Sequence, residues 1–343
     1  MGRIGILTGG GDCPGLNAVI RAVVRTAVGY HGDVVLGFRN GWRGVLDAAA
    51  TELTPEGTRG ILHRGGTILG TSRIDPFREA GGVEAVGDAL ALLRLDGLIV
   101  VGGEGTLAAA VRVAEAGVNV VGIPKSIDND IAGTDATFGF DTAVQIATDA
   151  IDRLHSTAES HHRVMVVETM GRHTGWIALS AGIAGGADVI LIPEEPFDVD
   201  AVGHHLKSRY ASGHPFSIAV VAEGAMPKEG TMPAPVYEPD AFGRPRLGGI
   251  GAVVAREIEA RTGFETRVTI LGHVQRGGSP TAHDRVLATR FGVAAADLAA
   301  GGRWGRMVAL RGDDVTSAPL DADAVRVRPV PPRLAELAEI FFG

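Results

Sequence analysis

Cysteine is nearly absent from this sequence, since Cys13 is the only one among 343 residues. A single cysteine cannot form a disulfide within its own chain, so we expect a protein of a reducing compartment and not a disulfide-stabilised secreted domain. Cys13 lies in a glycine-rich segment, where a small space-filling side chain is a better interpretation than a reactive nucleophile.

Basic charge and long apolar runs are also lacking. Lysine and arginine number 32 against 40 aspartates and glutamates, whereas nucleic-acid-binding proteins usually carry a basic excess. A few clustered arginines can still bind a small anion. The longest apolar stretches, such as Leu98 to Val101, are far too short to cross a bilayer, and no secretory signal opens the sequence. We therefore expect a cytoplasmic protein with neither a membrane nor a nucleic-acid partner.

Glycine, in contrast, is abundant, and many of the 50 glycines directly follow short apolar runs. An apolar run of four to six residues bounded by glycine is typical of a strand buried on both faces. Segments with helical spacing, such as the one containing Leu16, Ile20 and Val23, lie between these runs. The alternation predicts parallel sheets covered by helices. The runs are Ile4–Thr8, Leu98–Val101, Val118–Ile123, Val164–Val167, Val189–Ile192, Ile218–Val221 and Val268–Leu271.

The length exceeds that of one ordinary core, and the pattern falls into two halves that meet near residue 140. We therefore predict an α/β protein with two doubly wound, mainly parallel-sheet domains. Two stretches depart from the pattern. Met226 to Gly251, rich in proline and glycine, is expected to be a surface insertion. Arg326 to Arg333, also proline-rich, precedes a last short helix and is a candidate crossing between the domains.

Two glycine-rich turns follow predicted strands. In Thr8-Gly9-Gly10-Gly11-Asp12, glycines let backbone N–H groups approach an anion at the start of a helix, although a tight turn without a ligand is an open alternative. Gly102-Gly103-Glu104-Gly105-Thr106 adds a carboxylate that could hold Mg²⁺ between phosphate oxygens. The alternative for this second turn is a helix cap made by Glu104 and Thr106.

The sharpest motif is Pro124-Lys125-Ser126-Ile127-Asp128-Asn129-Asp130. Two carboxylates lie two residues apart in a loop after a buried strand, so one can accept a proton from a hydroxyl while the other orients it. A capping cluster for the next helix is the alternative. Lys125 and Ser126 favour phosphoryl transfer, because the charge on the transferring oxygens needs hydrogen-bond donors.

Basic side chains mark the strand ends of the second half. Met170-Gly171-Arg172 follows one predicted strand, and Glu223 ends another. Arg267, His273 and Arg276 flank a third strand beside a glycine-rich loop, which predicts a phosphate socket. A lone arginine would more often be a solvated surface charge, but three basic residues near one loop favour an anion site.

On these motifs the sequence resembles the 6-phosphofructokinase family, from Ile4 to about Phe291, and it is similar to the actinobacterial branch, in which ATP and pyrophosphate users are intermixed. The most specific segments are Ser126–Asp130, Met170–Arg172 and Leu271–Gly278. The resemblance implies a Mg²⁺-dependent enzyme that transfers the γ-phosphoryl group of ATP to the 1-hydroxyl of fructose 6-phosphate, giving fructose 1,6-bisphosphate and ADP in glycolysis. It also implies a homotetramer with active sites shared between subunits.

The resemblance further implies which ligand each domain binds and which role each site residue has. Residues 1–140 with about 280–303 would form the domain that binds the donor phosphates, and residues 141–279 with the tail 304–343 the domain that binds fructose 6-phosphate. Asp128 would be the general base, with Ser126, Asp130 and Arg172 beside the transferring phosphoryl group. The donor and its metal would be held by Gly11, Arg73, Ile74, Gly103, Glu104 (the metal carboxylate), Gly105, Thr106, Lys125 and Arg172. The sugar phosphate would be held by Ser126, Asp128, Arg163, Met170, Gly171, Arg172, Glu223, Arg267, His273 and Arg276, with Arg163 and Arg267 coming from the adjacent subunit.

Gly105 and Lys125 give opposite indications of the donor. Pyrophosphate enzymes of the family combine an aspartate at the first position with a lysine at the second. An aspartate would repel the α-phosphate of ATP, whereas a flexible lysine can swing aside, so Gly105 predicts ATP and a pyrophosphate-dependent enzyme is the alternative. Ile74 and Ala109 also depart from the family pattern, since an aromatic residue that stacks on adenine and a glycine are common there.

The effector site departs from the family as well. Arg21 and Arg25 match its basic residues, but His155 and His214 replace others. Histidine carries less positive charge than arginine or lysine at neutral pH, so we expect weak or altered control by anionic effectors such as ADP or phosphoenolpyruvate.

Three other classes fit less well. A Rossmann dehydrogenase needs G-x-G-x-x-G, and Gly9 to Gly15 is not in that register. A kinase of NAD or lipids shares a similar glycine loop but does not explain the arginines and histidine of the second half. A non-catalytic sugar-phosphate-binding protein would not need Asp128 and Asp130 together with Glu104.

Overall fold

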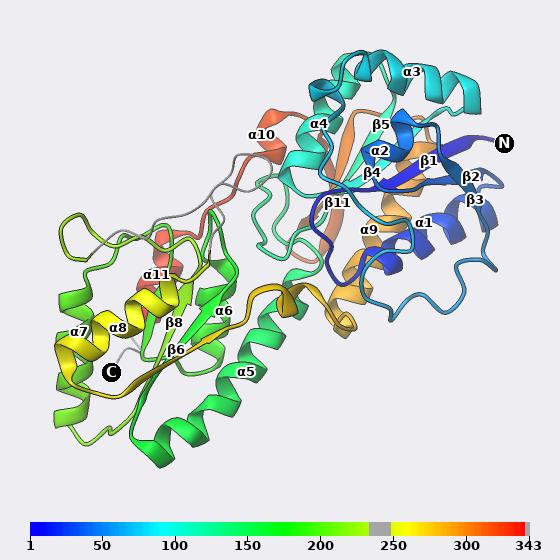
Figure 1. Cartoon of the computed structure of the whole chain (residues 1–343). Helices are drawn as coiled ribbons and strands as arrows, with labels where there is room; N and C mark the ends of the chain where they lie inside the picture. The colour runs from blue at the N-terminus through cyan, green and yellow to red at the C-terminus, as the bar shows by residue number, and fades with distance from the viewer. Residues whose placement is uncertain (233–247, 340–343) are drawn as a thin grey trace. The chain divides into compact units, whose positions relative to one another are not determined.

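The computed structural model describes residues 1–232 and 248–339, which form two compact units (Figure 1). The first unit comprises Met1–Thr142 and Arg276–Arg328. The second comprises Ala143–Gln275 and the residues from Pro329 onward. Neither unit is continuous in sequence, because the chain leaves the first unit after Thr142, returns at Arg276 and leaves again after Arg328.

The described part of the first unit contains a seven-stranded sheet in the order β11-β10-β5-β4-β1-β2-β3. The edge strands β3 and β11 are antiparallel to their neighbours, and the strands between them are parallel. The strands are β1 (Arg3–Thr8), β2 (Val34–Phe38), β3 (Ala50–Leu53), β4 (Gly97–Gly102), β5 (Val120–Pro124), β10 (Arg306–Arg311) and β11 (Asp314–Pro319).

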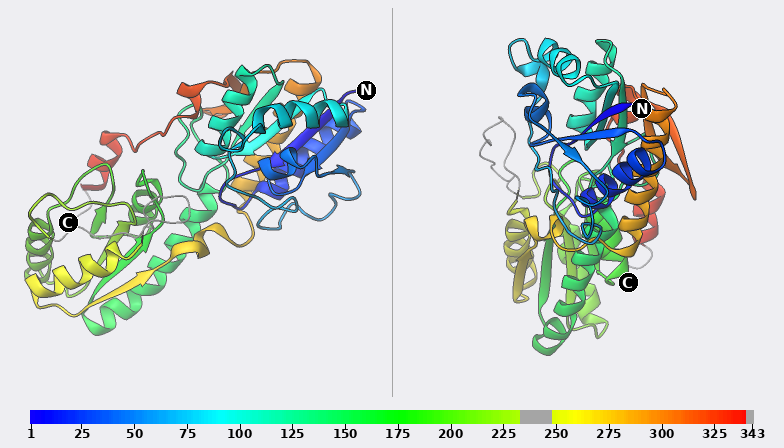
Figure 2. Two further views of the ribbon diagram at one scale, coloured as in Figure 1. Left: turned by 45° about the horizontal axis from the view of Figure 1, so that its top comes forward. Right: turned by 90° about the vertical axis from the view of Figure 1, so that its right-hand side faces the viewer.

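Helices cover both faces of this sheet (Figures 1 and 2). On one face α1 (Leu16–Gly29) and α9 (Ala282–Ala300) pack against each other. On the other face lie α2 (Trp42–Leu46), α3 (Gly82–Leu93) and α4 (Glu104–Glu115), with α10 (Ala322–Val325) against α4. A short 3-10 helix, η1 (Pro76–Arg78), precedes α3. Because helices cover it on both sides, β4 is buried along its whole length.

The strand order alone indicates a ligand-binding edge in the first unit. From β1 the chain continues to β2 on one side, and β4 then pairs with the other side of β1. In open α/β sheets, ligands bind beyond the carboxyl ends of the strands at such a reversal of order. Here β1 ends at Thr8 and β4 ends at Gly102, directly before the two glycine-rich turns.

The described part of the second unit contains a four-stranded, entirely parallel sheet in the order β7-β8-β6-β9. The strands are β6 (Val164–Thr169), β7 (Val189–Leu191), β8 (Ser217–Ala222) and β9 (Thr266–Ile270). The helices are α5 (Phe140–His161), α6 (Trp176–Ala184), α7 (Val199–Ala211), α8 (Ile250–Thr262) and α11 (Pro332–Glu339), and η2 (Gly272–Arg276) follows β9. Helices α7 and α8 pack together beside the sheet, and α11 contacts α6.

All seven strands expected from apolar runs are present, and the predicted fold class is confirmed. The expectation that each is buried on both faces is wrong for β9. Ile270 is 50% exposed and Val268 is 38% exposed. Within the described residues β9 pairs with β6 alone, so it is an edge strand with one uncovered side.

The expected position of the tail is wrong for residues 304–328. Strand β10 inserts between β5 and β11, and its residues Met307 to Ala309 are buried there, so this segment belongs to the first unit. The chain crosses to the second unit only at Pro329, where Val330 N–H donates to Glu194 Oε1 at 2.9 Å. The proline-rich segment Arg326–Arg333 is therefore the crossing predicted. Most of the expected insertion falls on residues 233–247, which lie outside the described residues.

Candidate active site

The first glycine turn is built around close contacts. Gly10 has a φ of +79°, and its backbone is tied down because Thr71 Oγ1 donates to Gly10 O at 2.6 Å and Gly10 N–H donates to Ser72 O at 2.9 Å. A Cβ on Gly11 would lie 2.2 Å from Arg276 Nη1, so a larger residue here would displace this guanidinium group. Arg276 also donates to the carbonyl oxygen of Asp12 at 3.3 Å. The structure thus brings Arg276 to the donor turn.

The second glycine turn meets the first through Thr106. This side chain is buried, and a Cβ on Gly9 would lie 2.7 Å from Thr106 Cγ2. Helix α4 has Gly103 as its N-cap and no side-chain capping bond, so Glu104 and Thr106 do not form the cap considered from sequence. Glu104 and Gly105 are exposed in the first turn of α4.

Lys125 is buried and anchored between these turns. Its side chain is 4% exposed, and its Nζ donates to Gly11 O at 2.5 Å. Burial lowers the pKa of Lys125, and the nearby Arg276 acts in the same direction, whereas Asp130 and Asp12 oppose the shift. The flexible lysine expected from sequence is therefore not observed, because its ammonium group is held by backbone.

The carboxylate loop after β5 has a defined internal geometry. Ser126 Oγ donates to Asp130 Oδ1 at 2.7 Å, and Asp128 N–H donates to Ser126 Oγ at 3.1 Å. The next helix, α5, begins only at Phe140, so Asp128 and Asp130 do not cap it. Ser126 therefore links Asp128 and Asp130 within this loop.

Residues that the sequence analysis did not single out hold this loop in place. Asn129 has a φ of +52°, and its Oδ1 accepts from Thr137 N–H at 3.0 Å. Thr137 Oγ1 donates to Ser126 O at 2.7 Å, and Arg328 Nη2 donates to Asn129 O at 2.9 Å. Asparagine tolerates this left-handed conformation better than most residues, which is a signal that the sequence contains. Nothing local marks Arg328, which lies 199 residues later.

In the second unit, the loops at the carboxyl ends of three strands are joined. Glu223 N–H donates to Thr169 O at 2.8 Å, and Gly224 N–H donates to Gly171 O at 3.0 Å. The buried amide of Gln275, also missed from sequence, accepts from Met170 N–H at 3.4 Å and donates to Gly272 O at 3.0 Å. These bonds bring together Met170, Gly171, Arg172, Glu223 and the exposed His273.

Arg163 and Arg267 lie at the other end of the same sheet. Arg163 precedes β6, and Arg267 is the second residue of β9, paired with Met165. Met170 follows the last residue of β6, so about 20 Å of strand separates it from Arg163. Within the second unit, the length of β9 therefore also separates Arg267 from His273, the two members of the predicted socket that lie in this unit. Instead both arginines contact Glu265, Arg163 at 2.8 Å.

The comparisons with known proteins decide the family. The phosphofructokinase family model matches residues 3–299. The chain belongs to the phosphofructokinase family. It is 56% identical over 341 residues to a protein of Amycolatopsis methanolica named pyrophosphate--fructose 6-phosphate 1-phosphotransferase, covering 99% of this chain and 100% of the relative. It is 54% identical over 343 residues, with the same coverage, to the ATP-dependent 6-phosphofructokinase of Mycobacterium tuberculosis.

A solved structure agrees with this family assignment. The phosphofructokinase of Saccharomyces cerevisiae superposes with a TM-score of 0.81 and 33% sequence identity. The match covers 99% of this chain, which spans about half (46%) of the length of that yeast chain. The phosphofructokinase fold predicted from sequence is therefore confirmed.

The expected Mg²⁺ site offers a single carboxylate, that of Glu104. No group of three His, Cys, Asp or Glu side chains among residues 1–232 and 248–339 is arranged to hold a metal ion by itself. Mg²⁺ is commonly bound by one or two carboxylates together with substrate phosphates, and the exposed Glu104 beside the glycine turns fits that mode. In the same described residues no helix is long and apolar enough to cross a membrane.

Among the other residues named from sequence are the two histidines of the expected effector site and two residues expected to bind the donor, Arg73 and Ile74. His155 Nε2 lies 2.6 Å from Gly185 O, and its ring packs edge-on to Phe216. His214 is exposed. Ile74 packs against the core of the first unit, whereas Arg73 is exposed.

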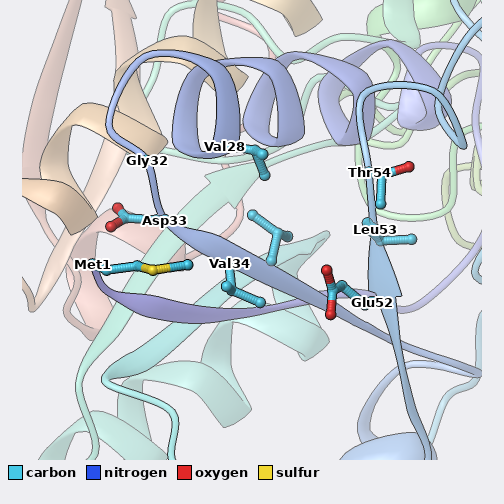
Figure 3. A pocket seen from close by; sticks show the side chains of 9 residues that line it. Met1, Val28, Gly32, Asp33, Val34, Glu52, Leu53 and Thr54 are labelled. Carbon is cyan, nitrogen blue, oxygen red and sulfur yellow. The ribbon is translucent and has the colours of Figure 1, made fainter.

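A pocket of the first unit lies apart from all these residues. Figure 3 shows its lining, which includes Met1, Val28, Asp33, Val34 and Glu52. Because β2 begins at Val34, this pocket is at the amino-terminal end of the parallel strands. The glycine turns are at the carboxyl end, so the pocket is not part of the candidate active site.

Proposed function

We propose that this chain is an ATP-dependent 6-phosphofructokinase, which transfers the γ-phosphoryl group of ATP to the 1-hydroxyl of fructose 6-phosphate. The observation that carries the proposal is the cluster at the carboxyl ends of β1, β4 and β5. There two glycine turns, a buried lysine and the hydrogen-bonded Ser126–Asp130 loop lie on adjacent strands. Such a cluster offers donors for phosphate oxygens and a carboxylate for a proton, which are the needs of phosphoryl transfer.

The proposed reaction exchanges one P–O bond for another. The sugar O1 attacks the γ-phosphorus, a new P–O bond forms, and the bond from the γ-phosphorus to the bridging oxygen breaks as ADP leaves. Asp128 accepts the proton of the 1-hydroxyl as general base. The Ser126–Asp130 hydrogen bond fixes the loop on which Asp128 lies. Arg172 and Arg276 supply positive charge for the transferring group and the donor phosphates.

The choice of ATP rests on Gly105. Beyond the helix's own backbone and the adjacent residues, no atom lies within 4 Å of the position that a Cβ would take there, so position 105 offers space to an α-phosphate and its glycine adds no negative charge of its own. Lys125 is held against Gly11 O, so the case for ATP cannot rely on a lysine that moves aside and depends on Gly105 alone. Relatives of 54% and 56% identity carry both kinds of name, so overall identity does not select the donor.

Mg²⁺ belongs to the same proposal. Glu104 would hold the ion together with oxygens of the donor, and the bound ion would neutralise charge that develops on the phosphates. Because the protein side offers few ligands, we expect metal binding to depend on the presence of the nucleotide.

A shared active site in a homotetramer is the third part of the proposal. Arg163 and Arg267 cannot reach the 6-phosphate of a sugar held near Met170 and Glu223 of their own chain, since a strand length separates them. They would instead serve the adjacent subunit. The exposed apolar residues Val268 and Ile270, beside Arg267 on the uncovered edge of β9, support a second copy of the chain at this surface.

The proposal is tested by comparing donors on one preparation of purified protein. Formation of fructose 1,6-bisphosphate is measured with Mg²⁺ and either ATP or pyrophosphate. We expect a higher kcat/KM with ATP. A higher value with pyrophosphate would replace the proposed donor, and binding of the sugar phosphate without turnover on either donor would favour a non-catalytic binding protein.

A further inference from the structure

One carboxylate is shared by two arginines in the second unit. Glu265 directly precedes β9, and its Oε1 lies 2.8 Å from Arg163 Nη2 and also accepts a hydrogen bond from Arg267 Nη2. The parallel pairing of Val164 with Thr266 sets these side chains at the same end of β6 and β9. The two guanidinium groups thus converge on a single oxygen atom.

The bonds to Glu265 leave part of the positive charge and one N–H donor of the two arginines unmatched. Within one chain Arg267 is 54% exposed and Glu265 is 42% exposed, so the shared ion pair can be reached by a ligand from outside that chain. The Nε of Arg163 is buried and has no hydrogen-bond partner among the described residues. Two guanidinium groups carry two positive charges, and Glu265 neutralises one of them. Arg163, above all, holds the pKa of Glu265 below its usual range, so the carboxylate is ionised at neutral pH.

A tethered carboxylate competes with free anions in a selective way. Because the carboxylate is part of the same chain, it is present at high effective concentration near the arginines. A dilute monoanion with one or two oxygens forms no stronger bonds to the arginines than the carboxylate does, so it does not displace it. A phosphate dianion carries more charge and three terminal oxygens, and guanidinium groups bind such oxygens in paired, charge-assisted bonds. It can therefore displace the carboxylate.

We propose that Glu265 is a specificity-determining residue, a built-in competitor that occupies Arg163 and Arg267 until a phosphate dianion displaces it. The proposal rests on the proposed function in assigning these arginines to the 6-phosphate of the sugar. Glu265 keeps the arginine pair from binding weaker anions, at the expense of some affinity for the substrate.

The test compares Glu265→Gln with the wild-type enzyme and with Glu257→Gln. Glu257 is a matched control, because it also pairs with an arginine, Arg261, on α8 of the same unit. We expect Glu265→Gln to lower KM for fructose 6-phosphate about threefold to tenfold with kcat nearly unchanged, in keeping with the modest strength of exposed ion pairs. Inhibition by acetate, a monoanion, should strengthen, and the control should show neither this effect nor the lower KM.

A second measurement does not depend on catalysis. The rise in Tm caused by sulfate should begin at lower sulfate concentration for Glu265→Gln than for wild type, and adding Arg267→Ala should abolish this gain. A raised KM, or an unchanged response to sulfate, would overturn the proposal and make Glu265 a support that orients the arginines. If wild-type protein does not phosphorylate fructose 6-phosphate, the proposed function fails, while the sulfate response still tests Glu265.

Discussion

Lys125 Nζ lies 2.5 Å from the carbonyl oxygen of Gly11, in a site where the lysine side chain is almost fully buried. This contact changes how the two donor signals should be weighed. A lysine held by backbone is part of the wall of the donor site, and moving it aside would break a buried, charge-assisted hydrogen bond. Position 105 is open, so it is the better place to test the donor preference.

Gly105→Asp should weaken the use of ATP at least tenfold in kcat/KM, because a carboxylate there would face the α-phosphate. A Cβ at position 105 has open space around it, and an acidic residue suits the first turn of α4, so folding should be unaffected. Steady-state kinetics with ATP check this. Gly105→Asn is the control, since it adds the same bulk without charge. Equal losses in both variants would mean that space, not charge, selects the donor.

Asp128→Asn should reduce kcat by about a hundredfold or more while leaving KM for both substrates within a few-fold of wild type, as expected for loss of a general base. The backbone bond from Asp128 N–H to Ser126 Oγ does not involve the side chain and is retained. Turnover is measured by coupled assay, and Tm serves as the folding control. Near-normal turnover with altered affinity would remove Asp128 from the base role.

Mixtures of Asp128→Asn and Arg267→Ala subunits should recover activity that neither variant has alone. In a hybrid oligomer, a site can receive an intact Asp128 from one chain and an intact Arg267 from the other. The variants are unfolded together, refolded and assayed, with each variant refolded alone as the control. Full activity of a demonstrably monomeric wild-type sample would show that each chain is complete by itself.

Cys13 should not react with iodoacetamide in the native protein. Burial raises the pKa of its thiol to about 12, so at pH 8 almost no thiolate, the reactive form, is present. In denaturant the thiol regains an ordinary pKa and exposure, and it should be labelled completely. Mass spectrometry of native and denatured samples gives the stoichiometry. Rapid labelling of the native protein would show that the glycine turn opens to solvent.

The sequence was most informative where a physical signal is local. Buried strands such as β4 are continuous apolar runs, and glycine turns at their ends follow from the close contacts that a side chain would prevent. The Ser126–Asp130 loop could be found for the same reason, since all its chemistry lies within five residues. The fold class and the site loop were therefore predictable without an alignment.

The remaining features depend on distant parts of the chain. Whether Met307 to Ala309 joins the first or the second sheet is decided by pairing with β5, some 180 residues earlier, and no local pattern records that partner. The contact of Arg328 with Asn129 is hidden in the same way. Arg163 and Arg267 were named from the family resemblance, but only the register of β6 and β9 shows that they share Glu265.

The repeated passage of the chain between the units has a consequence for synthesis on the ribosome. The first unit cannot finish its sheet when residue 142 emerges, because β10 and β11 lie more than 160 residues further on. Until then β5 presents an unpaired edge to the growing chain. The second unit in turn gains α11 only after β10 and β11 of the first unit have been made. Neither unit can be obtained by simple truncation, and an internal deletion that joins Thr142 to Arg276 through a short linker, with the chain stopped after Arg328, would be the way to produce the first unit alone.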